Sequence, residues 1–314
     1  MKYQTLGKTG ILVSPVALGT TALGMDYGIN APGDYGRPTK LEAIRLLHQS
    51  SDAGINLFDT APVYGESERL IGQAIGRRNN CHIATKVSVP ADSDGKLLDG
   101  AKLKQTLLNS IENSLLAMQR DFLDIVQIHN ATTEVINRGE ILEILLQAQK
   151  QGKLRFIGAS VYGEDAALEV IKSGCFDMLQ VAYNMLDQRM ARRVFPAAEH
   201  ANVGIITRSV FLKGALTPKA QWLPQELAPL RYAAERAKTT LTGSWEALPQ
   251  VALRYCLSTP QVATVLAGIR TLPELIKVLE AVAAGPLPAE VLAQTPKLAL
   301  AEEYLLNPSY WDVP

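Results

Sequence analysis

Charge of either sign is not in excess in this 314-residue chain, because 31 lysines and arginines balance 31 aspartates and glutamates. A nucleic-acid-binding surface needs a basic stripe, so the balance argues against a nucleic-acid partner. Long apolar runs are also missing: no segment approaches the roughly 18 uncharged apolar residues of a membrane helix, and the N-terminus has no apolar signal region. We therefore expect no membrane span and no secretion signal, and a cytoplasmic protein.

Cysteine is scarce, with three residues in the whole chain. Cys81, Cys175 and Cys256 are widely spaced and form no C-x-x-C pair. An odd number of scattered cysteines suits a reducing compartment, and each is most simply interpreted as a small core residue. Three of the four histidines have no partner at the spacing of metal ligands, so we expect no metal site.

What the chain does contain is an alternation of two kinds of segment. Longer stretches have helical spacing; in one of them Thr39 and Glu42 form a capping box, and Gly54 can end the helix. Between these stretches, eight short apolar runs begin at Pro15, Ile55, His82, Asp124, Arg155, Met178, Val203 and Ala263. Strands that alternate with helices and are apolar nearly throughout predict a parallel sheet covered on both faces.

The number of strand–helix units indicates the architecture. Eight units in one chain, with no linker between halves, favour a closed (β/α)₈ TIM barrel over an open doubly wound sheet. Residues 3–15 predict a β-hairpin that turns at Gly7 and Gly10 and plugs the barrel floor. Residues 287–314 predict an extra helix and an irregular tail. We therefore expect one α/β barrel domain over residues 1–314.

Polar side chains lie where three of the predicted strands end. Asp59 closes the second run, Lys86 the third and His129 the fourth. Tyr64 follows Asp59 in a short turn that contains proline and glycine. In a barrel of this kind the C-terminal ends of the strands form one rim, and active sites lie there. A carboxylate, a phenol, an ammonium and an imidazole are therefore expected to converge.

Together these four groups predict a tuned general acid. A tyrosine with its ordinary pKa of about 10 is a poor proton donor at neutral pH, and a nearby ammonium favours the phenolate. Asp59 would keep Lys86 charged and oriented, because a lone buried ammonium is costly. His129 would orient or polarise a carbonyl oxygen. Any one of the four alone is as well explained by an ordinary turn, core or surface role, but the combination favours catalysis in which an oxygen is protonated while a hydride reaches carbon.

Four segments carry a resemblance to a known family: LGKTGILVSPVALGT, FDTAPVYGESERLIGQAI, ATKV and DIVQIHN. In this order they resemble the aldo-keto reductase superfamily, over a region from about Tyr3 to Leu279. The resemblance implies a (β/α)₈ barrel, a nicotinamide coenzyme bound without a Rossmann domain, and a catalytic tetrad of Asp59, Tyr64, Lys86 and His129. In agreement, the chain has no G-x-G-x-x-G fingerprint.

The same resemblance implies the coenzyme-binding residues. Gly19 and Thr20 begin the nicotinamide ribose site, and Ser160 and Gln180 match the pair that hydrogen-bonds the carboxamide. Arg270 matches the family position that binds the adenosine 2′-phosphate. A planar guanidinium binds a phosphate bidentately, so the resemblance favours NADP over NAD. The other coenzyme contacts are expected at Asp59, Arg208, Ser209, Phe211, Lys213, Gly268 and Glu274.

Three residues depart from the family pattern. Arg208 stands where an aromatic residue usually stacks on the nicotinamide. It could stack through its flat guanidinium, bind the coenzyme pyrophosphate or an anionic substrate, or serve as a structural ion-pair partner. Glu274 and Val278 replace residues that normally contact adenine, which leaves NAD possible.

Three functions therefore stay open. The first is an NADP-dependent reductase of an aldehyde or ketone, with Tyr64 as the proton donor. The second is an NAD(P)-dependent sugar dehydrogenase that oxidises an aldose, and the third is an NADPH-binding redox-sensing subunit with little turnover. Their partner would be a small carbonyl compound or sugar, and a monomer is favoured. Candidate substrate contacts are Tyr27, Tyr64, His129 and Trp222.

Overall fold

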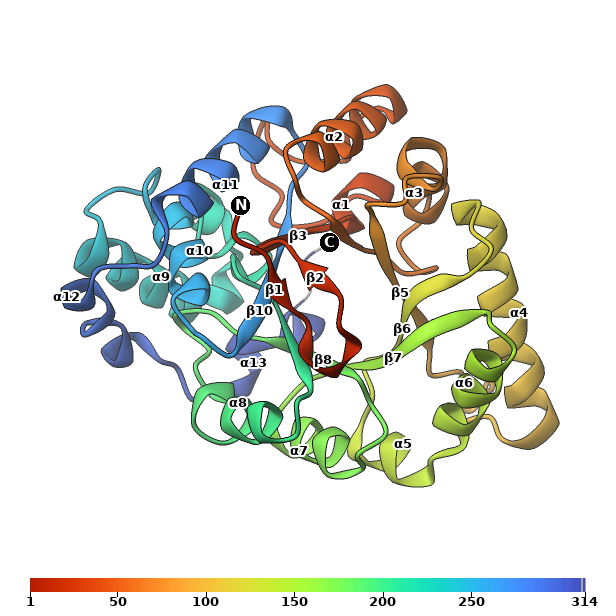
Figure 1. Ribbon diagram of the computed structural model, residues 1–314. Helices are drawn as coiled ribbons and strands as arrows, with labels where there is room; N and C mark the ends of the chain where they lie inside the picture. The colour runs from red at the N-terminus through yellow and green to blue at the C-terminus, as the bar shows by residue number, and fades with distance from the viewer. Residues whose placement is uncertain (312, 314) are drawn as a thin grey trace.

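A closed barrel of eight parallel strands forms the centre of the protein (Figure 1). The computed structural model describes residues 1–311 and 313. Each strand overlaps one of the predicted apolar runs, so the predicted (β/α)₈ barrel is confirmed. In chain order the barrel strands are β3 (Val16–Gly19), β4 (Leu57–Asp59), β5 (His82–Ser88), β6 (Leu123–His129), β7 (Leu154–Val161), β8 (Met178–Ala182), β9 (Gly204–Arg208) and β10 (Val262–Gly268).

Helices surround the barrel as an outer ring (Figure 1). The first long one begins at the predicted capping box, where Thr39 Oγ1 accepts from the Glu42 N–H and the Glu42 carboxylate accepts from the Thr39 N–H. The helices before β10 are α1 (Thr21–Gly24), α2 (Lys40–Asp52), α3 (Ser67–Ile75), α4 (Gly100–Met118), α5 (Thr133–Arg138), α6 (Glu140–Lys150), α7 (Glu164–Lys172), α8 (Met190–His200), α9 (Ala228–Leu241) and α10 (Leu248–Leu257). After β10 follow α11 (Leu272–Ala284), α12 (Ala289–Leu292) and α13 (Glu303–Leu306).

The predicted N-terminal hairpin is present and covers the barrel opening at the amino ends of the strands (Figure 1). Its strands β1 (Gln4–Thr5) and β2 (Leu12–Val13) pair antiparallel around a 3₁₀ turn. Gly7 in that turn has a φ of +49°, and a Cβ there would lie 2.2 Å from the Gly204 nitrogen. Only glycine allows this approach, so the hairpin can dock directly on the start of β9.

The C-terminal segment, which the sequence predicts as an extra helix and an irregular tail, is divided into shorter pieces. It contains two one-turn helices, α12 and α13, separated and followed by 3₁₀ turns. Pro288, Pro296 and Pro308 recur along it, and a proline in a helix interior removes a hydrogen bond and clashes with the preceding turn. Trp311 anchors the segment, because its indole N–H donates to the Tyr304 carbonyl at 2.7 Å.

The interior of the barrel changes from apolar to polar along the strands. Leu57, Ala84, Ile125, Met178 and Ile206 belong to one buried apolar cluster with the hairpin. Two residues further along their strands stand Asp59, Lys86, Gln127, Gln180 and Arg208. Because side chains two positions apart in a strand share a face, these polar residues form a layer directly above the apolar floor. The candidate site is built on this layer.

Candidate active site

The centre of the site is a buried ion pair. Lys86 Nζ lies 2.5 Å from Asp59 Oδ1, and the two side chains are 1% and 3% exposed. Lys86 also donates to the Thr60 carbonyl at 2.8 Å. Burial lowers the pKa of Lys86, but the charge of Asp59 and the neighbouring Tyr64 hydroxyl outweigh it, so the pKa lies above its usual value. The side chain is therefore an ammonium ion at neutral pH.

The second oxygen of Asp59 is held by two glutamines. The side-chain amides of Gln127 and Gln180 each donate to Asp59 Oδ2 at 2.8 Å, and Gln180 also donates to Gln127 Oε1 at 3.0 Å. Gln127 is fully buried and is not among the site residues predicted from the sequence. Gln127 precedes the candidate His129 by two residues on the same strand. Because side chains two positions apart in a strand face the same side, this spacing could have indicated Gln127 as a site residue. These bonds fix the carboxylate that orients Lys86.

Tyr64 lies above the ion pair, on the turn between β4 and α3. Lys86 Nζ is 4.9 Å from the centre of the Tyr64 ring, and the His129 ring meets Tyr64 edge-on at 5.9 Å between centroids. Hydrogen bonds from the Tyr64 N–H to the Ala61 carbonyl and from the Ser67 N–H to the Tyr64 carbonyl hold the turn. The four residues predicted to converge therefore do lie together at one rim of the barrel.

His129 is a neutral imidazole at physiological pH. Burial, followed by the positive charge of Lys86, lowers the pKa of His129 to about 4. The nearby Asp59 opposes this effect, and Arg208 adds to it. A neutral imidazole carries one N–H donor and one acceptor nitrogen, so His129 can hydrogen-bond a carbonyl oxygen without bringing a charge.

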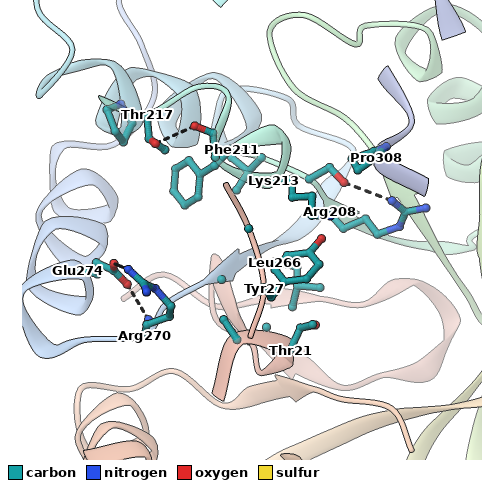
Figure 2. A pocket seen from close by; sticks show the side chains of 18 of the residues that line it. Thr21, Tyr27, Arg208, Phe211, Lys213, Thr217, Leu266, Arg270, Glu274 and Pro308 are labelled. Atoms are coloured by element: carbon teal, nitrogen blue, oxygen red, sulfur yellow. Dashed lines mark hydrogen bonds and ion pairs between the residues drawn. The ribbon is translucent and has the colours of Figure 1, made fainter. Parts of the chain in front are cut away.

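A cavity of about 700 Å³ opens above these residues. Figure 2 shows part of its wall, including Tyr27, Arg208 and Arg270. This volume is within the usual range of ligand sites. It extends from the Asp59–Tyr64 end to the start of α11. Of the residues selected from the sequence, Gly19, Tyr27, Asp59, Tyr64, His129, Ser160, Gln180, Arg208, Ser209, Phe211, Lys213, Gly268, Arg270 and Glu274 line it.

Three residues selected from the sequence do not line the cavity: Thr20, Trp222 and Lys86, the last of which is buried beneath Tyr64. The Thr20 hydroxyl is fully buried, donates to the Asp59 carbonyl at 2.8 Å and contacts Ser67 Oγ at 2.5 Å. Thr20 therefore links the end of β3 to the end of β4. Trp222 is 53% exposed at the end of a 3₁₀ turn, because Ala220 of that turn is the residue packed inward. The indole side chain is left outside the cavity wall.

Arg208 stacks on an aromatic residue that the sequence-based search missed. Its guanidinium carbon lies 4.0 Å from the centre of the Tyr162 ring, and Tyr162 lines the cavity. The guanidinium also donates to the Val161 carbonyl at 3.1 Å. It donates to Ser209 Oγ at 3.2 Å as well, a contact drawn as the dashed line at Arg208 in Figure 2. No carboxylate among residues 1–311 and 313 lies within ion-pair distance of it, so the structural ion-pair alternative finds no support. Its positive charge faces the cavity.

Two further cations lie on the cavity wall. Lys213 lies over the Tyr27 ring at 5.2 Å and donates to the Val313 carbonyl, which brings the tail next to the first loop. Burial lowers the pKa of Lys213. Arg270, at the far end, is held by its neighbour Glu274 and by the first loop. Any coenzyme phosphate would meet this wall.

Neither a metal centre nor a membrane helix stands out in the part of the chain that the structure describes. No group of three or more His, Cys, Asp or Glu side chains there is arranged to hold a metal ion. No helix in the same residues is long and apolar enough to cross a membrane.

A (β/α)₈ barrel with an ion-paired lysine beneath a tyrosine, at one end of a cavity, is an arrangement suited to an oxidoreductase. The family model of the aldo/keto reductase family matches residues 15–299. The chain belongs to this family, so the resemblance stated from the sequence is confirmed. Enzymes of this family are oxidoreductases that act on small carbonyl compounds with a nicotinamide coenzyme.

The relatives agree with this assignment. An Escherichia coli protein called NADH-specific methylglyoxal reductase is 28% identical over 305 residues, covering 88% of this chain and 92% of its own. An Arabidopsis thaliana protein called L-galactose dehydrogenase is 27% identical over 290 residues, covering 88% and 86%. The holo structure of aldo-keto reductase AKR11C1 from Bacillus halodurans has a TM-score of 0.78 and 26% identity, covering 96% of this chain and 97% of that one.

Proposed function

We propose that the protein reduces an aldehyde or ketone to the alcohol, with NADPH as the hydride donor and Tyr64 as the proton donor. The observation that carries this proposal is the buried Lys86–Asp59 pair directly beneath the Tyr64 ring. A phenol is a poor acid unless a neighbouring charge stabilises its anion. Here a fully buried ammonium supplies that charge at short range.

The roles of the four residues follow from their contacts. When bound, the nicotinamide supplies a hydride to the carbonyl carbon. The Tyr64 hydroxyl gives its proton to the carbonyl oxygen, and the Lys86 ammonium stabilises the phenolate that remains. Asp59 keeps Lys86 charged, because an unpaired buried ammonium would favour its neutral form. Neutral His129 donates a hydrogen bond to the same oxygen and so orients the substrate.

Two buried polar groups support a nicotinamide at the inner end of the cavity. Ser160 is 1% exposed, and its hydroxyl makes no hydrogen bond to any other described residue. Gln180 uses its amide N–H groups on Asp59 and Gln127, while its carbonyl oxygen accepts from none of the described residues. Both residues line the cavity, so these two atoms are available to a ligand there. A carboxamide offers both an acceptor for Ser160 and donors for Gln180.

The coenzyme preference is proposed from the outer end of the cavity. Arg270, with a side chain only 12% exposed, is the group best suited to a 2′-phosphate, which favours NADP(H). The second candidate, NAD(H), is favoured by the carboxylates of Asp34 and Glu274 that already hold this guanidinium. The name of the E. coli relative points the same way as the second candidate.

The test is coenzyme oxidation, followed by absorbance, with a panel of aldehydes, diketones and sugars. The wild type would be assayed beside Tyr64→Phe, with NADPH and NADH in parallel. We expect Tyr64→Phe to lower kcat by about 10² to 10⁴ while coenzyme binding is unchanged, which is the usual contribution of a positioned general acid. A mutant that keeps wild-type turnover would exclude Tyr64 as the proton donor.

A second candidate reaction is the oxidation of a sugar, favoured by the similarity to a protein called L-galactose dehydrogenase. Aldose oxidation with NAD⁺ that exceeds carbonyl reduction on the whole panel would support it. Tight NADPH binding with no turnover in either direction would instead support the redox-sensing subunit. The cytoplasmic location and the monomeric state also stay predictions, and light scattering after gel filtration tests the second.

A further inference from the structure

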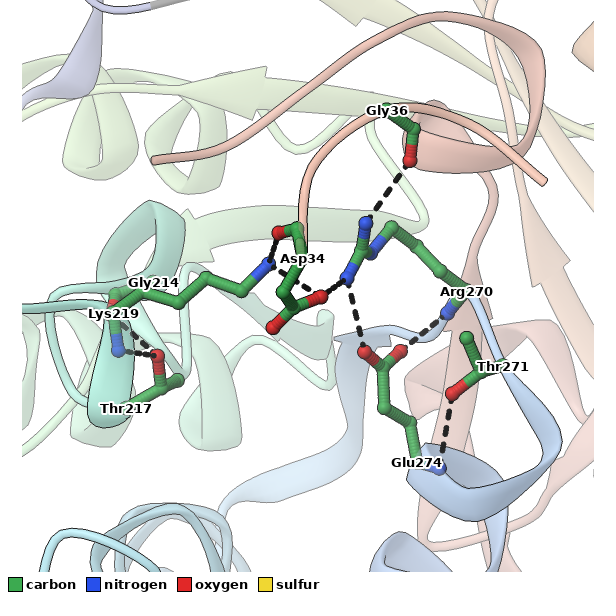
Figure 3. Close-up of polar contacts among 8 residues, drawn as sticks. All are labelled: Asp34, Gly36, Gly214, Thr217, Lys219, Arg270, Thr271 and Glu274. Atoms are coloured by element: carbon green, nitrogen blue, oxygen red, sulfur yellow. Dashed lines mark hydrogen bonds and ion pairs between the residues drawn. The ribbon is translucent and has the colours of Figure 1, made fainter. Parts of the chain in front are cut away.

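An acidic residue of the first loop contacts the far end of the coenzyme cavity. Asp34 lies in the segment between α1 and α2, and its carboxylate accepts from the Arg270 guanidinium (Figure 3). The Gly36 carbonyl of the same loop accepts from Arg270 as well, at 2.9 Å. Glu274 completes the ring of acceptors, at 2.6 Å from the Arg270 backbone N–H and 3.4 Å from its guanidinium. The Arg270 guanidinium therefore has three acceptors, and Asp34 and Glu274 share its Nη2.

The loop is held from its other side by Lys219. Its ammonium lies 3.2 Å from the Asp34 carboxylate and donates to the Asp34 carbonyl at 2.6 Å (Figure 3). Asp34, Lys219, Arg270 and Glu274 all line the cavity, and we call these four residues the Asp34 clasp. Two cations and two anions make its net charge zero. The clasp joins the first loop, the segment after β9 and the start of α11 across the cavity.

The members of the Asp34 clasp differ in how deeply their side chains are buried. The side chains of Arg270 and Lys219 are 12% and 18% exposed, whereas that of Asp34 is 53% exposed. The cations are thus fixed in the wall, and Asp34 is the member that another anion can replace. A half-exposed ion pair contributes little to stability, so its replacement costs little.

We propose that Asp34 sets the coenzyme preference of this enzyme by competing with a ribose 2′-phosphate for Arg270. This inference rests on the proposed function. A 2′-phosphate needs the guanidinium donors that Asp34 occupies, and it would bring a second anion beside Glu274. The 2′-hydroxyl of NADH has no such need, because it can donate to a carboxylate, as acidic residues accept from it in other dinucleotide sites. NADPH must displace Asp34, and NADH need not.

The test compares the dissociation constants of both coenzymes in wild type, Asp34→Asn and Asp34→Ala, measured by calorimetry. We expect both variants to bind NADPH about tenfold more tightly, a change of about 1.4 kcal/mol, and NADH within about twofold of wild type. The two variants should also bind adenosine 2′-monophosphate more tightly than the wild type does, as they bind NADPH more tightly. The matched control is Asp121→Asn, since Asp121 is exposed, lies before β6 at the opposite end of the barrel, and makes no ion pair with any described residue.

The outcomes separate this inference from the function on which it rests. Equal shifts for NADPH and NADH, or weaker NADPH binding in the Asp34 variants, would overturn the role of Asp34 while leaving the reductase proposal intact. If Asp121→Asn also bound NADPH more tightly to the same extent, the effect would come from the net charge of the protein. That result would also overturn the role of Asp34. If the wild type and every variant bound neither coenzyme, both the inference and the proposed function would be wrong.

Discussion

Lys86 and Asp59 form an ion pair, 2.5 Å apart, from which water is almost wholly excluded. Each carboxylate oxygen of Asp59 has its own partners: the ammonium on one side and the two glutamine amides on the other. A buried ion pair is stabilising only when its remaining hydrogen bonds are satisfied in this way. The charge that we propose to act on Tyr64 is therefore also a part of the folded structure, and activity and stability should respond together when it is changed.

Asp59→Asn should destabilise the protein. The change leaves the Lys86 ammonium buried without a counter-ion, and removing one partner of such a pair costs about 3 to 5 kcal/mol. Urea denaturation monitored by circular dichroism would measure the loss. The double variant Asp59→Asn with Lys86→Met is the control and should recover a large part of it. Single and double variants of equal stability would show that the charge of Lys86 is not the cause.

His129 should make the folded state less stable as the pH falls. Its pKa is lowered to about 4 in the folded protein, whereas an unfolded histidine has a pKa of about 6.5. Between these values the unfolded chain binds a proton that the folded chain does not, so unfolding becomes more favourable at lower pH. Between pH 7 and pH 5 the cost should be about 2 kcal/mol.

The comparison with His129→Asn isolates this contribution. Other groups titrate in both proteins, so the wild type should lose about 2 kcal/mol more than the variant over that pH range, measured by urea denaturation. An NMR titration of the His129 imidazole gives an independent measure, because its signals should stay those of the neutral ring down to about pH 5. A normal titration near pH 6.5 would contradict the burial argument.

Gly24→Ala should displace Tyr64. A Cβ at residue 24 would lie 1.9 Å from the Tyr64 carbonyl oxygen and 2.5 Å from the Ser67 nitrogen, so the turn that carries the phenol must move. A shift of about 1 Å at a catalytic group can cost about 10² in rate. We expect kcat to fall by about that factor, while NADPH affinity changes by less than about threefold, because the atoms that the new Cβ meets belong to Tyr64 and Ser67 and not to the residues that hold Arg270.

The control for that substitution is Gly95→Ala. Gly95 has a positive φ, +77°, which Gly24 does not have, and a Cβ there meets no atom within 4 Å. It should cost about 1 kcal/mol of stability through backbone strain and leave kcat unchanged. If both variants kept full activity, the close contact at Gly24 would not fix the position of Tyr64.

The sequence predicts best those features that repeat or lie near one another in the chain. Eight apolar runs indicate the barrel, and the ends of three of them indicate Asp59, Lys86 and His129. The two-residue repeat of side chains along a strand also predicts the position of Gln127. It stands two residues before His129 and therefore faces the barrel interior as well. The prolines of the C-terminal segment likewise predict that its helices are short, because a proline interrupts a helix. The helical spacing of the apolar residues alone does not indicate this.

Contacts that depend on the path of a loop could not be predicted. Asp34 and Arg270 are 236 residues apart, and they meet because of turns at glycines with positive φ, Gly28, Gly33 and Gly36. Glycine in a sequence permits such a backbone conformation without specifying it. Similarly, nothing in the residues around Trp222 states which side of its turn packs inward. Local patterns predict which residues occupy a strand, whereas loop contacts require the folded structure.

Arg208→Met should change substrate preference. The guanidinium rests on Tyr162 at 4.0 Å and faces the cavity, where it can bind an anionic group of the substrate. A hydrogen bond to a charged group contributes about 1.5 to 3 kcal/mol, or about ten- to a hundredfold. We expect the ratio of kcat/KM for an ω-carboxy aldehyde over a neutral aldehyde of equal length to fall by about this factor.

Tyr162→Phe is the matched control, because it keeps the flat ring beneath the guanidinium and should leave the ratio unchanged. The dissociation constant of NADPH, measured on the same variants, distinguishes the two ligands that Arg208 could serve. An unchanged substrate ratio with weaker NADPH binding would assign the guanidinium to the coenzyme. A lower ratio with unchanged NADPH binding would assign it to the substrate, since only a contact with the substrate can discriminate between two aldehydes that share one coenzyme.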